Sequence, residues 1–181
     1  MDDPKDKDEI VTALEQTAQE IKGYFSGLTP QQFYSGTQQH WAPAHHLQHL
    51  TPSVRPVALG LKTPKLLLSL LSLGKPVPKH TYAKIRDTYR RALAGGNARA
   101  TGVFAPRLEG GVYEADRSKV LEGFFKAHTS LVGALDPWGD QSLDEHAMPH
   151  PALGQLSVRE MLFFSLYHNR HHPQGARMRL G

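Results

Sequence analysis

The chain has 181 residues, of which 39% are hydrophobic and 21% charged, a balance typical of one globular domain with a buried core. It contains no cysteine, which excludes disulfides, thiolate nucleophiles and cysteine-ligated metal sites. Its net charge of +4 comes from Lys and Arg scattered along the chain without a DNA-binding signature, so we expect no nucleic-acid partner.

Targeting signals are missing from the printed sequence. Residues 1–9 lack the basic start and hydrophobic stretch of an export signal. The longest hydrophobic run, Leu66–Leu73, is far shorter than the roughly 20 residues that a membrane span needs. We therefore expect one cytoplasmic domain over residues 1–181, outside any membrane, with residues 1–6 and 177–181 loosely ordered.

The first elements in chain order are helical. Hydrophobic residues recur every three or four positions across Lys7–Leu28, which predicts a long helix with one buried face. Thr29 followed by Pro30 is typical of an N-cap and a first helical position, so a short helix should run over 31–34.

Pro43 opens a second long helix, which carries His49. Pro52 and Pro56 lie inside it, and each proline removes a backbone donor and crowds the preceding turn. We therefore expect this helix to be kinked, or to restart after Thr51.

The middle of the chain alternates hydrophobic and irregular stretches. Pro64–Leu73 is hydrophobic on all sides and predicts a short buried helix, a cover over an opening or a contact between subunits. Thr81–Ala94 has the pattern of an amphipathic helix. The glycine-rich segment Gly95–Gly111 predicts a long irregular connection, and such connections often border a site.

Two further helices complete the pattern. Asp116–Leu135 has strong helical spacing, and the last helix should begin at Ser157, whose hydroxyl and Glu160 form a capping box. No alternating run is long enough to predict a sheet. The sequence therefore indicates an all-α protein, a four-helix bundle with short extra helices.

Histidines are the residues that indicate chemistry. His168 and His172 are four residues apart, so on one helix both imidazoles face the same side and can share an ion. His49, from the other histidine-rich helix, is our candidate third ligand. The alternative is accidental spacing, because the chain has 11 histidines and a buried histidine is often only a core residue.

The neighbouring polar residues have less certain roles. We expect His45, His46 and His171 to be exposed or to support the ligands, and His128 to be a core residue. Spacing does not place a general acid or base, and candidates in the loop before the last helix are Asp144, Glu145 and His146.

Three stretches carry a resemblance to a known family. They are Trp41 followed by His49 and Leu50; His150, Pro151 and Gly154 leading to Leu156, Ser157 and Glu160; and the run from Tyr167 to His172. In these stretches the sequence resembles the DinB-like family of four-helix-bundle metal-dependent enzymes, which includes YfiT-like proteins and bacterial thiol transferases.

The resemblance implies an up-down-down-up bundle, commonly a homodimer, in which His49, His168 and His172 bind nickel or zinc. The chain departs from the family pattern at Ala42, which stands where a serine cap is usual, and at Pro173, where we expect the last helix to bend or end.

Two classes of function follow. The first is a metal-dependent transferase or hydrolase, with transfer of a low-molecular-weight thiol to an electrophilic small molecule as the reaction that the resemblance favours. Arg170 and Arg177 are candidates to hold a carboxylate of such a thiol, and the favoured alternative is that they face solvent. The second is a non-catalytic metal-binding protein with a stress-response or structural role.

Overall fold

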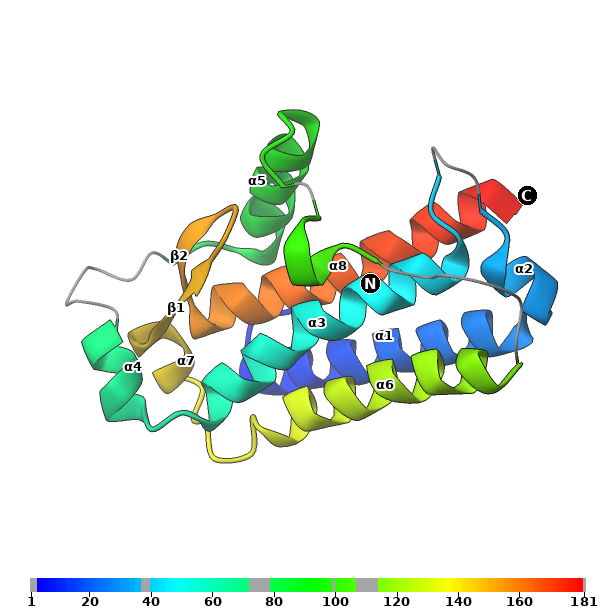
Figure 1. Ribbon diagram of the computed structural model, residues 1–181. Helices are drawn as coiled ribbons and strands as arrows, with labels where there is room; N and C mark the ends of the chain where they lie inside the picture. Colours follow the sequence, from blue (N-terminus) through cyan, green and yellow to red (C-terminus); the bar gives the residue numbers. More distant parts are fainter. Residues whose placement is uncertain (1–2, 37–39, 72–78, 99, 107–113, 181) are drawn as a thin grey trace.

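A computed structural model describes residues 3–36, 40–71, 79–98, 100–106 and 114–180. Four long helices form a bundle: α1 (Lys7–Gly27), α3 (Pro43–Lys62), α6 (Glu114–Gly133) and α8 (Val158–Leu180). Helices α1 and α3 each pack against both α6 and α8. Figure 1 shows α1 and α8 running in one direction and α3 and α6 in the other, which confirms the up-down-down-up bundle.

Short elements surround the bundle. The helical ones are α2 (Pro30–Tyr34), α4 (Lys65–Leu71), α5 (Tyr82–Ala94), the 3-10 helix η1 (Gly102–Phe104) and α7 (Ser142–Glu145). The expectation of no sheet was wrong, because β1 (Ala147–His150) and β2 (Gly154–Ser157) pair antiparallel. Strands of four residues are too short to show alternation, and Gly154, with φ of +76°, permits the turn between them. Figure 1 shows α4, α7 and the two strands near one end of the bundle, and α2 at the opposite end.

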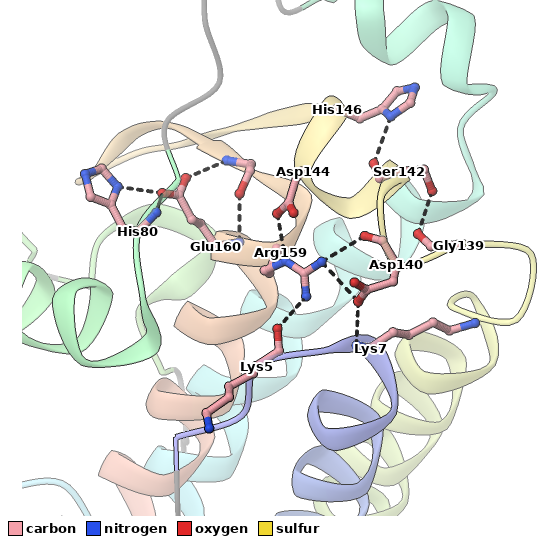
Figure 2. Close-up of polar contacts among 11 residues, drawn as sticks. Lys5, Lys7, His80, Gly139, Asp140, Ser142, Asp144, His146, Arg159 and Glu160 are labelled. Carbon is pink, nitrogen blue, oxygen red and sulfur yellow. Dashed lines mark hydrogen bonds and ion pairs between the residues drawn. The ribbon is translucent and has the colours of Figure 1, made fainter.

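The start of α8 is tied to the rest of the chain by Arg159, which is only 8% exposed. Its guanidinium donates to the Asp144 carboxylate (2.7 Å) and to the backbone carbonyls of Asp140 (2.8 Å) and Lys5 (2.9 Å), as Figure 2 shows. The backbone carbonyl of Lys5 therefore connects the segment before α1 to the start of α8.

The predicted capping box at the start of α8 is present. The Ser157 hydroxyl accepts from the Glu160 amide (3.0 Å), and the Glu160 carboxylate accepts from the Ser157 amide (2.7 Å). The same carboxylate also accepts from His80, which ties the entrance of α5 to α8 (Figure 2). These bonds hold the first turn of the helix that carries His168.

The prolines interrupt neither long helix. Helix α3 is continuous through Pro52 and Pro56, and α8 runs on past Pro173 to Leu180. The restart after Thr51 and the end at Pro173 are therefore wrong, whereas the alternatives, a kink in α3 and a bend in α8, stay predictions.

A proline inside a helix costs about 3 kcal/mol relative to alanine. Buried residues lie within four positions on both sides of each proline, such as Leu50 and Val54 around Pro52, and Asn169 and Ala176 around Pro173. Their packing outweighs the lost backbone bonds.

Helix α4 lies at one end of the bundle, and only one of its sides packs against the rest of the protein. Leu68 is 4% exposed, whereas Leu66 is 76% exposed, so of the alternatives for this stretch the short buried helix is wrong. Residues 72–73 of the predicted stretch lie outside the described residues. The contact between subunits stays a prediction. Within the described residues, no helix is long and hydrophobic enough to cross a membrane.

His45 supplies one half of a capping box at the start of α3, where Ala42 has no side-chain oxygen to cap the helix. The Nδ1 of His45 accepts a hydrogen bond from the Ala42 amide at 2.9 Å. Because half of a capping box is lost without this acceptor, we expect His45→Ala to lower the free energy of unfolding by about 1 kcal/mol in urea denaturation. His45→Gln, which restores the usual acceptor, should stay within about 0.5 kcal/mol of wild type. Equal losses in both variants would contradict this role.

Candidate metal centre

The structure brings together the three histidines that the sequence singled out. His168 Nε2 lies 3.1 Å from His49 Nε2 and 3.1 Å from His172 Nε2. One ring nitrogen from each residue lies within 4.8 Å of the other two. The first ligand candidate comes from α3 and the other two come from successive turns of α8.

Burial keeps these imidazoles neutral. His49 is 7% exposed and His168 is 3% exposed. Burial is the largest cause that lowers the pKa of His49, and a hydrogen bond with the Phe104 carbonyl partly opposes it. The pKa values of His168 and His172 lie well below the usual value, first because of burial and then because the neighbouring histidines repel added charge. A neutral imidazole has one unprotonated ring nitrogen, whose lone pair can bind a metal ion.

Neighbouring groups orient the rings. His49 Nδ1 donates to the Phe104 carbonyl at 2.7 Å, which leaves the Nε2 of a neutral His49 with a bare lone pair. His172 Nδ1 lies 2.9 Å from His46 Nδ1, so His46 supports a candidate ligand. The Trp41 ring stacks on His172 at 5.9 Å and also contacts His46 and His49.

The arrangement fits a divalent metal ion. His168 Nε2 can donate a hydrogen bond to only one of its two neighbours, so three neutral rings cannot satisfy one another. A shared cation would accept all three lone pairs. Zinc–nitrogen bonds of about 2.0–2.1 Å at tetrahedral angles place ligand nitrogens about 3.3 Å apart, close to the spacing seen here.

A cavity of about 480 Å³ leads to this centre. Its walls come from α3, α4, α5, the connection through η1, the β1–β2 hairpin and α8, and they include His49 and His168. The prediction that the segment after Gly95 borders a site is confirmed for its described part, where Thr101 and Phe104 line the cavity. Residues 107–111 of that segment lie outside the described residues.

The two candidate arginines do not line this cavity. Arg170 and Arg177 line a separate pocket between α1 and α8. Arg170 donates to Thr17, and Arg177 lies over the Tyr24 ring at 4.8 Å. Asn169 and Arg170 follow His168 on α8, and the turn of the helix directs them toward α1 rather than α3.

The candidate acids and bases also lie elsewhere. Asp144 pairs with Arg159, Glu145 accepts from Gln141, and His146 Nδ1 contacts the Ser142 carbonyl. Among the described residues, none of the three candidates lines the cavity.

His128 lies on α6, where burial lowers its pKa to about 4, and it lines an open groove beside α1. Its side chain is only 4% exposed, which agrees with the expectation of a core residue, but its buried Nε2 has no hydrogen-bond partner among the described residues.

Sequence reasoning missed two residues of the cavity wall, Tyr89 and His150. Tyr89 lies in the segment Thr81–Ala94, for which the sequence predicted an amphipathic helix and no functional residue. His150 entered only as part of a His-Pro motif, whose position beside the cavity depends on a hairpin that the sequence did not predict. The remaining supporting histidine, His171, is half-buried and stacks on Tyr167.

A family model described as the DinB superfamily matches residues 8–174. Two solved structures share the fold, each with 17% identity and a TM-score of 0.58 over 94% of this chain. TT2238, described as a four-helix bundle protein, is covered over 98% of its chain. YfiT from Bacillus subtilis, described as a probable metal-dependent hydrolase with an unusual four-helix bundle topology, is covered over 83%. No curated protein matches the sequence.

Proposed function

The chain belongs to the DinB superfamily, and we propose that it is a metal-dependent hydrolase whose zinc or nickel ion is bound by His49, His168 and His172. The observation that carries the proposal is the cavity that opens onto two of three convergent imidazoles. Catalytic metal sites typically have three protein ligands and one position open to water or substrate. The description of YfiT as a hydrolase agrees with this reading.

The protein's own residues prepare the site for hydrolysis. When bound, a divalent ion supplies Lewis acidity and lowers the pKa of water toward neutrality. His49 is held in one tautomer by the Phe104 carbonyl, and His172 is held by His46. Burial raises the pKa of Tyr89 to about 12, so its phenol keeps its proton and can donate to a substrate in the cavity.

The lining of the cavity favours hydrolysis over thiol transfer. A low-molecular-weight thiol with carboxylates needs cationic partners, but none of the described residues in this wall is Lys or Arg. Arg170 and Arg177 face a different pocket. Thiol transfer is therefore an alternative reaction of the same centre, and the experiment below includes it.

A non-catalytic metal protein is the rival from another class. Structural zinc sites are usually closed by a fourth protein ligand. Within the described residues, the group that can hold an ion contains three histidines, and a cavity reaches it. A three-histidine centre that a cavity reaches supports a catalytic role over a structural one.

The test is hydrolysis of a panel of uncharged esters and amides by protein loaded with zinc or nickel. We expect turnover that is lost on chelation and restored by metal. A parallel arm adds small thiols and an electrophile, and product formation only in that arm would replace hydrolysis with thiol transfer. A metal-loaded protein that is inert in both arms would contradict an enzymatic role.

A further inference from the structure

His150 is fixed in one tautomer by the hairpin that carries it. Its Nδ1 accepts hydrogen bonds from two backbone amides, those of Ala152 (3.1 Å) and Leu153 (3.0 Å). A nitrogen that accepts two hydrogen bonds carries no proton, so the proton of the neutral ring is on Nε2. Burial lowers the pKa of His150 to about 4, which keeps the ring neutral at physiological pH.

The His150 ring lies in the same wall as a candidate metal ligand. It packs against Phe164 at 4.2 Å between ring centroids, and Phe164 in turn stacks on His168 at 5.0 Å. The Tyr89 ring contacts both histidine rings, with centroid distances of 6.4 Å to His150 and 5.7 Å to His168. His150 and His168 both line the cavity, so one bound molecule can contact both.

The Nε2–H of His150 has no acceptor within the part of the chain that the structure describes. Because Nδ1 faces the turn, Nε2 lies on the part of the ring that is directed away from the hairpin backbone. A neutral donor in a largely apolar wall suits an oxygen that is itself uncharged in the ground state.

The cavity wall also restricts the charge of a ligand. None of its described residues is Asp, Glu, Lys or Arg, and most are apolar, including Val57, Leu68, Met148 and Phe164. Away from the candidate metal ligands, a charged group placed against this wall would lose hydration without gaining a charged side chain as partner. An uncharged molecule with a hydrocarbon part would lose little hydration free energy on entering the cavity.

We propose that the cavity binds an uncharged acyl compound, an ester or amide with a hydrocarbon chain, and that His150 Nε2–H donates a hydrogen bond to its carbonyl oxygen. This inference rests on the proposed hydrolase function and adds the class of substrate and a catalytic donor. Water adds across the acyl bond: its hydroxyl joins the acyl carbon, and its other proton goes to the departing alcohol or amine. His150 keeps its proton and stabilises the negative charge that develops on oxygen.

Two variants separate this role from a structural one. His150→Asn can keep an acceptor near the position of Nδ1 for the turn, but it removes the donor at Nε2. His150→Gln can place an amide donor near the position of Nε2, but it removes the acceptor for the turn. If His150 donates to the substrate, His150→Asn should be less active and bind ligand less tightly than His150→Gln. His150→Gln should have the lower free energy of unfolding.

The first readout is binding without turnover or metal. Calorimetry after chelation should show that hexanamide binds the wild type, and that hexanoate and hexylammonium bind at least about tenfold more weakly. His150→Asn should weaken hexanamide binding roughly tenfold, and His150→Gln should weaken it roughly threefold or less. Equal binding by wild type and His150→Asn, or preferred binding of a charged probe, would overturn the proposal.

The second readout uses nitrogen NMR of histidine-labelled protein, which should show His150 with a protonated Nε2 and a bare Nδ1. In the metal-loaded enzyme, His150→Asn should lower kcat about 100-fold with unchanged metal content. If kcat of His150→Asn equals that of wild type and His150→Gln is inactive, His150 only supports the turn. If hexanamide binding follows the expected order but no ester or amide is hydrolysed, the substrate cavity stands and the hydrolase proposal fails.

Discussion

His168→Ala should lower the affinity of the protein for Zn²⁺ by at least about 100-fold, because His168 Nε2 is the central atom of the three-nitrogen group. Loss of a residue that only supports a ligand typically costs 10- to 100-fold in metal affinity, and loss of a ligand should cost no less. Competition calorimetry with a chelator of known affinity measures the change. The same variant should lose metal-dependent hydrolysis.

His171→Ala is the matched control for His168→Ala. His171 lies on the same helix and is half-buried, but it stacks on Tyr167 and lies outside the three-nitrogen group. We expect its Zn²⁺ affinity to stay within about threefold of wild type, as for a substitution that leaves the ligands in place. Equal losses in His168→Ala and His171→Ala would mean that the ion binds elsewhere or that α8 as a whole is perturbed.

Removal of the metal should lower the melting temperature by about 5–10 °C. An ion at 100 times its dissociation constant stabilises the folded state by about 2.7 kcal/mol, and each kcal/mol shifts the melting temperature of a domain of this size by about 2–4 °C. The stabilisation arises because one ion links α3, through His49, to α8, through His168 and His172. Circular dichroism melts with zinc and with chelator measure it.

The melting temperature of His168→Ala tests whether the stabilising ion binds at the three histidines. His168→Ala should melt at the same temperature with zinc and with chelator, within about 1–2 °C. A wild-type protein whose melting temperature ignores zinc would contradict a site formed in the folded state. A variant that still responds fully would place the stabilising ion at another set of ligands.

Local signals account for the parts of the fold that sequence predicted. The Ser157–Glu160 capping box and the four-residue spacing of His168 and His172 depend only on helix geometry, and both appear in the structure as expected. The helix restart at the α3 prolines and the end at Pro173 were wrongly predicted because the cost of a proline is local, whereas the burial that keeps α3 and α8 continuous comes from other helices.

The site was predictable in part. His45, His46 and His49 are close in sequence, but packing gives each a different role. His45 caps the helix, His46 contacts His172, and His49 faces His168. Only tertiary structure separates these roles. The role of His150 was hidden for a similar reason, because a hairpin of two four-residue strands carries it to the cavity.

Arg170 and Arg177 show the limit of proximity in sequence. Both lie within nine residues of His168 in the printed chain, which suggested a place beside the metal. One helix nonetheless presents residues three or four positions apart to one side and their neighbours to another. The arginines therefore line the α1 side of α8 while the histidines face α3.

The most direct test of the central claim is anomalous diffraction from crystals of the wild-type protein grown with zinc or nickel. The three-histidine centre predicts one strong anomalous peak per chain, bonded to Nε2 of His49, His168 and His172 at about 2.0–2.1 Å for zinc. A well-ordered chain with no peak between these rings, or with its strongest peak on other residues, would contradict it.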